Sequence, residues 1–470
     1  MEEQQNLKIF EISFIKPNQE SPPVSAFKDI KKIYFNNIVI ISSQLVMTAN
    51  LFLLGHLLYE KKIHYTLFIT FQIGVFILEV FGRVFFLGLL KYLFDGKNEN
   101  KIFIKMKTLF VILIPIILIP LSLLSYFIIK LLFQYNLEIY DQHINKEVWL
   151  KFLIFTPAIY LFELLLFLNI ILLTFHRQLL ITVFFYVILF IISHFVLSFI
   201  LLYILEIGII GLTISYFVNA FLFYFFSNNK IKNDENYDGQ DFFFFLIPHH
   251  QNFNCELIEL LKKKSYTSLI NYVDVVVIYI LFFASLFTDR NQLIVNIIYI
   301  NFYELLSAIN KGFYYNLKNY IWEKMDDTDY KQNYVKIFSF YFMLITLGIF
   351  LVLVLIKNVL LDLYLFDGGE ILIKNASNQL KIIYPICILS MAIRMNLNGI
   401  LRGMNVALHP LKKLLYIGIY MLLCYIFCFY LKLEICGLWI SLLFFDVFLI
   451  LESIYKAIIY FPKFFHSSNF

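Results

Sequence analysis

GLTIS, at Gly211 to Ser215, returns as GLWIS at Gly437 to Ser441 in a chain made mostly of hydrophobic segments. The two copies lie 226 positions apart. A second landmark supports this register, because Pro157 precedes the first copy by 54 residues and Pro385 precedes the second by 52. An internal repeat of this length predicts two membrane-embedded halves of common design, which is an organisation of several transporter architectures.

The composition excludes a water-soluble protein. Of the 470 residues, 61% are hydrophobic and 15% are charged, which is too little polar material to cover a soluble surface. About 20 residues span a bilayer as a helix. Charge-free runs of 20 or more residues occur at Ile33 to Tyr59, Thr108 to Ile129, Gln178 to Leu205, Ile207 to Asn229 and Ile337 to Ile356. We therefore expect an integral, multi-pass membrane protein.

Charge and cysteine usage favour neither nucleic acid nor metal as a partner. The formal net charge is +5, and the basic residues form no nucleic-acid-binding stripe. The five cysteines lack metal-ligand spacing. We expect no nucleic acid, no metal and no other cofactor, and we expect the chain to work as a monomer in the lipid bilayer.

The hydrophobic pattern predicts an all-α polytopic protein with twelve transmembrane helices in two pseudo-symmetric six-helix lobes. The predicted spans are 34–58, 64–90, 106–130, 149–174, 179–204, 208–227, 266–288, 292–317, 335–357, 378–401, 413–431 and 435–460. Six spans return the chain to its starting side, so both lobes insert in the same orientation and the pseudo-twofold axis follows the membrane normal. The expected parts are an N-terminal tail at 1–32, an N-lobe at 33–227, a linker at 228–264, a C-lobe at 265–460 and a C-terminal tail at 461–470.

The distribution of Lys and Arg predicts the orientation. With a cytoplasmic N-terminus, inside segments hold 25 basic residues and outside loops hold 10, an excess that favours cytoplasmic N- and C-termini and a cytoplasmic linker. The sequon Asn375-Ala376-Ser377 then falls in an outside loop. The sequence does not choose between the plasma membrane and an organelle membrane.

Ionisable groups inside apolar spans are candidate functional residues, because they are costly to place in lipid. The candidates ranked highest for proton coupling and substrate binding are Glu163, Asp274, Glu304 and Arg394. A carboxyl group in a cavity of low dielectric can bind and release protons during transport. A second acid, Asp446, is expected near a span end, within reach of water.

Three other positions carry expectations about packing. His194, alone in its helix, is interpreted as an interhelical polar contact more readily than as a titrating group. Pro157 and Pro385 each remove a backbone hydrogen bond, so kinks are predicted in the fourth and tenth spans. The two repeat strings themselves are interpreted as packing elements, since glycine lets helices approach closely in lipid.

The string GILRG, at Gly399 to Gly403, precedes Gly437-Leu438-Trp439, and the chain also has Gly312-Phe313 and the turn Phe94-Asp95-Gly96. In these features residues 30 to 460 resemble the multidrug and toxic compound extrusion (MATE) family, which carries a similar GVLRG string and a later GLW. The resemblance implies two six-helix lobes around a central cavity that opens alternately to the two sides of the membrane.

The chain departs from the family at its acids. Eukaryotic members have an acid where this sequence has Met391, and the acid at the repeat-equivalent position here is Glu163, in the other half. Arg394 lies one turn from Met391, which predicts a contact between Glu163 and Arg394 across the cavity. The seventh span offers only Asp274 where the family has two acids, and Glu304 lies about one turn from the usual acid of the eighth span.

The resemblance implies a secondary active antiporter, not an enzyme, that exports organic and preferably cationic solutes in exchange for protons. Sodium remains possible as the coupling ion. Two alternatives stay open. A flippase for lipids or lipid-linked sugars would favour a basic cavity, to which Arg83, Lys311 and Arg394 would contribute. A structural membrane subunit without transport activity would explain the missing acids.

Overall fold

The computed structural model describes part of the chain. The described residues are 180–207, 209–232, 273–289, 371–404, 406 and 410–466, most of 292–310, and scattered positions between 111 and 123, 161 and 173, and 344 and 352. These residues are almost all helical, and no strand occurs among them. The all-α class is confirmed, whereas the count of twelve helices and the boundaries of the lobes stay predictions.

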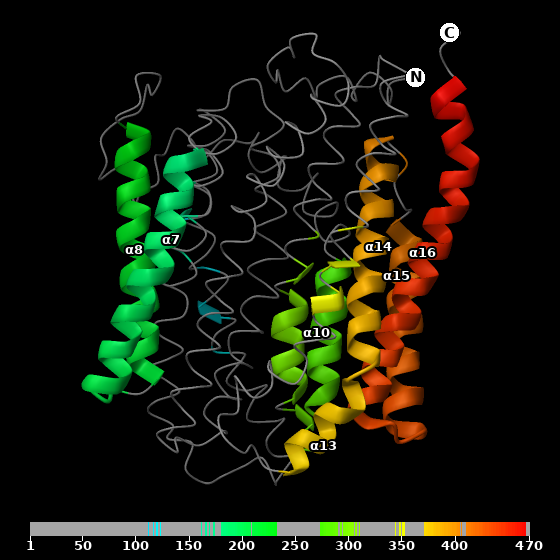
Figure 1. The fold of residues 1–470 in the computed structure, drawn as a ribbon, viewed down its shortest axis with the longest axis horizontal. Coiled ribbons are helices and arrows are strands. Elements are labelled where there is room, and N and C mark those ends of the chain that lie inside the picture. The colour runs from blue at the N-terminus through cyan, green and yellow to red at the C-terminus, as the bar shows by residue number, and fades with distance from the viewer. Residues whose placement is uncertain are drawn as a thin grey trace. The chain divides into compact units, whose positions relative to one another are not determined.

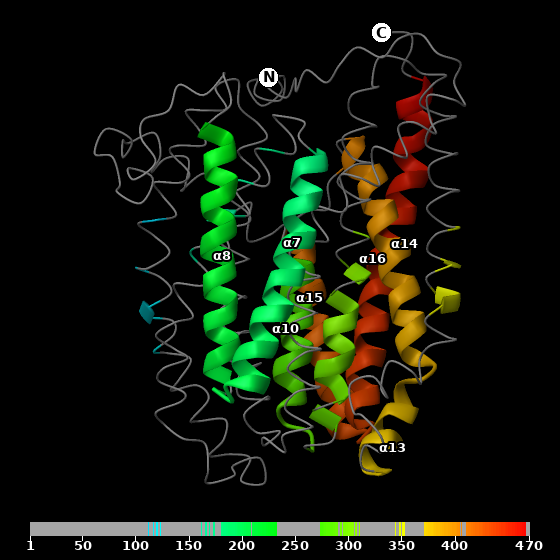
Figure 2. The ribbon, with the colours of Figure 1, turned by 60° about the vertical axis from the view of Figure 1, so that its left-hand side comes forward.

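The described residues belong to two compact units, the first ending at Val276 and the second beginning at Val277. In the first unit, α7 (Leu180–Phe199) continues into the π-helix η4 (Ile200–Ile204) and then reaches α8 (Ile209–Lys232). α7 and α8 lie side by side (Figures 1 and 2). α8 continues past the predicted end of the lobe at 227, because Asn228 and Ile231 are still buried against the unit.

Most described helices of the second unit follow α10 (Val273–Ser285), which starts just before the boundary. They are α13 (Ile371–Leu380), α14 (Ile383–Gly403), α15 (Pro410–Cys424), the π-helix η7 (Tyr425–Tyr430) and α16 (Glu434–His466), together with the helical positions of 292–310. α16 packs against both α14 and α15 (Figures 1 and 2).

Four of the described helical stretches are long and apolar enough to cross a membrane. They are Phe185–Ile204, Ile383–Leu401, Lys412–Tyr430 and Glu434–Tyr460. Their outer faces carry large apolar side chains, such as the exposed stripe Phe185, Leu189, Ile192, Val196 and Phe199 along α7. The inner face of the same helix buries His194 and Ser198. Polar residues inside and apolar residues outside are the arrangement expected for helices in lipid.

The structure shows the repeat in its backbone. The amide of Leu205 donates to the Ile200 carbonyl at 2.9 Å, and that of Leu431, 226 positions later, donates to the Ile426 carbonyl at 2.8 Å. Both π-helices then turn through a residue in the left-handed region, Glu206 (φ 52°) and its counterpart Lys432 (φ 54°). The register of 226 is therefore confirmed in the last turn of each helix and in the turn that follows.

The glycines of the repeat strings lie against these π-helices. A Cβ atom on Gly437 would sit 2.5 Å from the carbonyl carbon of Phe427 and 2.6 Å from the amide nitrogen of Cys428. A Cβ on Gly211 would meet the Cβ of Leu201 at 3.0 Å, ten residues earlier as in the other copy. The strings are packing elements, as predicted, because they bring the helix after the turn onto the helix before it.

One local expectation is wrong, and another is met at a neighbouring position. Pro385 is the third residue of α14, in the first turn, where a missing amide breaks no helical hydrogen bond, and the helical path is interrupted just before it, at residues 381–382 between α13 and α14. Pro157 lies outside the described residues. The sequon lies in helix α13, not in a loop, and the Ser377 hydroxyl is buried and pairs with Tyr299 Oη at 3.0 Å.

Substitution of the repeat glycines tests this packing. Gly437→Ala is expected to destabilise the protein by about 3 kcal/mol, because backbone atoms that cannot rotate away occupy the space of the methyl group. Gly211→Ala should cost less, since the nearest atoms, all of Leu201, lie at 3.0 to 3.3 Å. Gly418→Ala is the matched control, with no atom within 4 Å, and should be neutral or slightly stabilising. Thermal unfolding in detergent measures the order, and equal effects of the three variants would contradict it.

Candidate functional site

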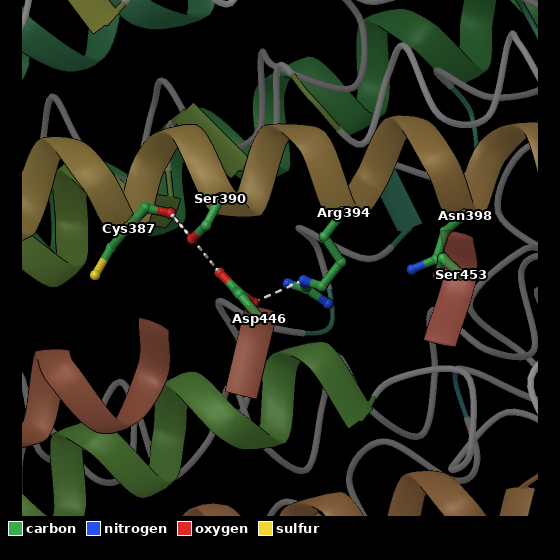
Figure 3. A network of polar contacts seen from close by, with 6 residues as sticks. All are labelled: Cys387, Ser390, Arg394, Asn398, Asp446 and Ser453. Atoms are coloured by element: carbon green, nitrogen blue, oxygen red, sulfur yellow. Dashed lines mark hydrogen bonds and ion pairs between the residues drawn. The ribbon is translucent and has the colours of Figure 1, made fainter. Parts of the chain in front are cut away.

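An ion pair joins α14 to α16 in the core of the second unit. Arg394 Nε lies 2.7 Å from Asp446 Oδ1, and the two side chains are 3% and 0% exposed (Figure 3). Arg394 lies near the middle of the apolar stretch Ile383–Leu401, and Asp446 lies near the middle of Glu434–Tyr460. Two opposite charges therefore meet deep within the apolar region.

Ser390, on α14, also contacts the Asp446 carboxylate. Its Oγ lies 2.9 Å from Asp446 Oδ2 and 2.9 Å from the carbonyl oxygen of Cys387, so its single hydroxyl hydrogen can serve either acceptor (Figure 3). On the other side, the Arg394 guanidinium carbon lies 5.9 Å from the ring centroid of Phe445, within range of a cation–π contact. The pair is thus built from α14 and α16 with an aromatic wall.

Aromatic and polar contacts fix the beginning of α16 beside α14. Trp439 Nε1 donates to Asn296 Oδ1 at 2.8 Å, and the Trp439 ring packs edge-on against Tyr384 at 5.1 Å and Tyr303 at 5.7 Å. Gln292 pairs with the Glu434 carboxylate at the first residue of α16. The helices run parallel, with Cys387 near Trp439 and Asn398 near Ser453.

Asp446 does not reach water, contrary to the sequence-based expectation. It lies about three turns inside α16 and is fully buried. The predicted bounds of the last span, 435–460, already place residue 446 near the centre of the span. This central position indicates that Asp446 is buried and needs a positively charged partner. Arg394, on a span that runs in the same direction, is such a partner.

The structure locates the four predicted site residues unequally. Arg394 is in the pair with Asp446, while Glu163, its predicted partner, lies outside the described residues. Glu304 lies on the helical segment 292–310 and is half-buried. Asp274 belongs to α10, but its side chain is not among those described. A shared cavity lined by the three carboxylates therefore stays a prediction.

The first unit repeats the architecture around the pair. Asn169 Nδ2 donates to Ser227 Oγ at 2.9 Å, and the corresponding contact in the second unit joins Ser453 to Asn398 Oδ1 at 3.5 Å. The serines are 226 positions apart and the asparagines 229. The same helix contact thus occurs in both units.

The first unit has no charges at the positions of the ion pair. An offset of 226 from Asp446 leads to Ala220, which is fully buried. Offsets of 228 and 229, set by the prolines and the asparagines, lead from Arg394 to Leu166 and Leu165, both buried leucines. The fold therefore accommodates an apolar pair where the second unit has Arg394 and Asp446.

His194 forms the interhelical polar contact that the sequence favoured. It is 1% exposed, and its Nδ1 lies 3.0 Å from the hydroxyl of Ser215, which belongs to GLTIS. Ser198 Oγ donates to the same hydroxyl at 2.9 Å. The counterparts of these residues in the second unit are Tyr420, Cys424 and Ser441, where Cys424 again contacts the other two.

Substitution of one or both charged residues tests whether the stability of the fold requires the ion pair. Asp446→Ala leaves Arg394 buried without its carboxylate and should destabilise the protein by about 3 to 5 kcal/mol. The double variant Arg394→Leu, Asp446→Ala copies the first unit and should recover most of that loss. Thermal unfolding in detergent compares them, and a double variant less stable than the single variant would contradict the argument.

No protein-family model and no curated protein sequence matches the chain. Solved structures do match it. The eukaryotic MATE transporter AtDTX14 shares 14% identity over 93% of this chain and 96% of its own, with a TM-score of 0.70.

Two microbial structures are similar over nearly their whole length. The Vibrio cholerae MATE transporter VcmN shares 13% identity over 95% of this chain and 99% of its own, with a TM-score of 0.67. A MOP superfamily transporter from Pyrococcus furiosus, described as having a binding pocket of reverse polarity, shares 12% identity over 95% of this chain and 99% of its own. The TM-score is 0.66. The resemblance in sequence is confirmed in three dimensions, and the chain has the fold of the MATE transporters.

Proposed function

We propose that this protein is a secondary active transporter that exports organic solutes, preferably cations, in exchange for protons. The observation that carries the proposal is the match of almost the whole chain to MATE transporters of both eukaryotic and microbial origin. The apolar outer faces of the described helices support a location in the bilayer, where such a transporter works.

The coupling groups in this proposal are the carboxylates of Glu163, Asp274 and Glu304. A carboxylate that accepts either a proton or an organic cation, but not both, makes the two fluxes compete for one site. Competition at a site that opens alternately to each side produces exchange. The solute leaves as the proton enters, so the proton gradient supplies the energy and no chemical bond of the solute changes.

Arg394 is assigned a different role from the carboxylates. Its charge is balanced by Asp446 at 2.7 Å, so it does not make the second unit basic. This balance weakens the flippase alternative, because that alternative needs an excess of positive charge to hold a phosphate headgroup. Solute cations would instead meet aromatic rings and carboxylates.

The remaining parts of the proposal concern placement. The excess of basic residues in the predicted inside segments supports cytoplasmic termini. A monomer in the plasma membrane or in an organelle membrane fits this arrangement, with a small organic solute as its substrate and either protons or sodium as the coupling ion. Protons are favoured because the candidate carboxylates are isolated along the sequence and form no dense cluster of oxygen ligands.

Reconstitution tests the exchange. Proteoliposomes with an acidic interior should accumulate a fluorescent organic cation, and Glu304→Gln should reduce the initial rate by at least about tenfold, since an amide cannot exchange protons. Glu206→Gln, which removes an exposed carboxylate in the turn after η4, is the matched control and should keep the wild-type rate.

Two further measurements, with different ion gradients and different transported molecules, distinguish the proposed antiporter from the alternatives. Accumulation that persists when a sodium gradient replaces the pH gradient would assign sodium as the coupling ion. Movement of labelled lipid between leaflets without uptake of the cation would contradict the proposal and support the flippase. A protein that moves neither would be the structural subunit.

A further inference from the structure

We propose that Lys412, Glu452 and Lys456 form a headgroup site that binds an anionic phospholipid at the edge of the second unit. The site lies between the start of α15 and the second half of α16. Its ligand is a lipid with a net negative charge, whose headgroup pairs with the ammonium group of Lys412. The proposal does not depend on what the protein transports.

The two lysines lie at the same end of two neighbouring spanning helices. Lys412 is the first residue of the apolar stretch Lys412–Tyr430, and Lys456 lies four residues before the end of the stretch Glu434–Tyr460. The contact between Lys412 and Glu452 places the start of α15 beside this part of α16. The ends of spanning helices lie where hydrocarbon gives way to lipid headgroups.

One carboxylate oxygen serves both lysines. Lys412 Nζ lies 3.5 Å from Glu452 Oε1, and Lys456 Nζ lies 3.6 Å from the same atom. If Lys412 turns to another anion, Glu452 keeps its contacts with Lys456 and with Tyr416 on α15. Exchange of the partner of Lys412 therefore does not leave the Glu452 carboxylate without a cation.

The three side chains are exposed to different degrees. Glu452 is 8% exposed and Lys456 is 15% exposed, whereas Lys412 is 59% exposed. The contact of Lys412 with Glu452 is also longer than the roughly 2.8 Å of a strong charge-assisted hydrogen bond. A lysine that is this exposed and this loosely held can reach a phosphate group by a change of its own side chain.

The surface around the lysines is apolar. Leu415 on α15 is 63% exposed, while Leu451 and Tyr455 on α16 are 58% and 65% exposed. Acyl chains cover such side chains in a bilayer, and tyrosine is typical of the boundary with the headgroups. A cation beside an apolar face matches an amphiphile with a negative headgroup. Free phosphate would gain nothing from that apolar face, so we assign the site to a lipid.

The predicted orientation agrees with this ligand. The distribution of basic residues along the sequence predicts that the start of α15 and the end of α16 face the cytoplasm. Anionic lipids are concentrated in the cytoplasmic leaflet, where they attract lysine side chains close to the membrane surface. The headgroup bound by Lys412 would therefore come from this leaflet.

The first unit lacks this set of three charges. The offset of 226 leads from Lys412, Glu452 and Lys456 to Tyr186, Phe226 and Lys230. Lys230 is exposed near the end of α8, so the first unit has one lysine at an equivalent place. Substitution of Lys230 therefore removes a positive charge on the same predicted side of the membrane and leaves the proposed site unchanged.

Native mass spectrometry of the full-length protein in detergent measures the dissociation constant of each bound lipid. Titration with palmitoyl-oleoyl phosphatidylserine should give a first binding step about fivefold tighter than titration with the matched phosphatidylcholine. Lys412→Gln should weaken the binding of phosphatidylserine about fivefold and leave the binding of phosphatidylcholine unchanged. Lys230→Gln is the matched control and should keep both wild-type constants.

Glu452→Gln has an expected effect of the opposite sign. The variant removes the negative charge that competes with the headgroup for Lys412, so phosphatidylserine should bind severalfold more tightly. A purely structural role of the three residues would instead weaken binding in both the Lys412 and the Glu452 variants, or in neither. Because the effect of Glu452→Gln is a gain, a folding defect in a variant cannot imitate it.

Three outcomes would overturn the proposal. The first is equal affinity of the wild-type protein for phosphatidylserine and phosphatidylcholine, a comparison that needs no variant. The second is an equal loss of affinity in Lys412→Gln and Lys230→Gln, which would indicate a general attraction of basic residues to anionic lipid. The third is displacement of phosphatidylserine by millimolar inorganic phosphate, which would assign the site to the free anion. Failure of proton-driven uptake of the organic cation would contradict the proposed function and leave all three measurements unchanged.

Discussion

Helices in lipid gain little from burying one apolar side chain against another, because the surrounding acyl chains are equally apolar. This constraint is visible in several of the described contacts between helices. Where α8 follows η4 and α16 follows η7, glycines allow backbones to touch. Elsewhere polar contacts such as Ser215 with His194 and Trp439 with Asn296 point inward, beside buried aromatic pairs such as Phe190 with Phe223. Many large apolar residues of α7 and α16 lie on the outer faces.

The two units share this scaffold but differ in the charged residues that it carries. The turn after each π-helix, the glycine against it and the contact between an asparagine and a serine are common to both units. The pair of Arg394 with Asp446 is present only in the second of these two sets of equivalent positions. In the proposed transport cycle, such a symmetric frame would supply two similar moving parts, and an asymmetric charge would distinguish one from the other.

Much of the fold could be predicted because it follows from periodic features. Lengths of apolar runs gave spans such as 179–204 and 413–431 close to the described helices, and GLTIS with GLWIS gave the register. These predictions succeed because lipid, unlike water, offers no hydrogen-bond partners, so each spanning helix must form all its backbone hydrogen bonds internally. The π-helices could not be predicted, because one residue more in a turn leaves the hydrophobic pattern almost unchanged.

The site was harder to predict than the fold. Arg394 pairs with Asp446, a partner that the sequence does not predict, because a sequence shows which residues are ionisable and not which helices are neighbours. The contact between Glu163 and Arg394 stays a prediction. Asp446 was misjudged because a lone acid in a long final span was assumed to lie near water. The bend expected at Pro385 lies instead in the break between α13 and α14, because Pro385 falls in the first turn of α14, where it interrupts no helical hydrogen bond.

The two π-helices also bear on the history of the chain. η4 and η7 end at the same offset, with the same backbone hydrogen bonds and the same left-handed residue after them. A wide turn arises by insertion of one residue into a regular helix, and its presence in both units is most simply explained by an insertion that preceded duplication. The charges of α14 and α16 differ from their counterparts, so they diverged afterwards. In this order of events the backbone of one ancestral half was settled first, and the ionic chemistry became specific to one descendant.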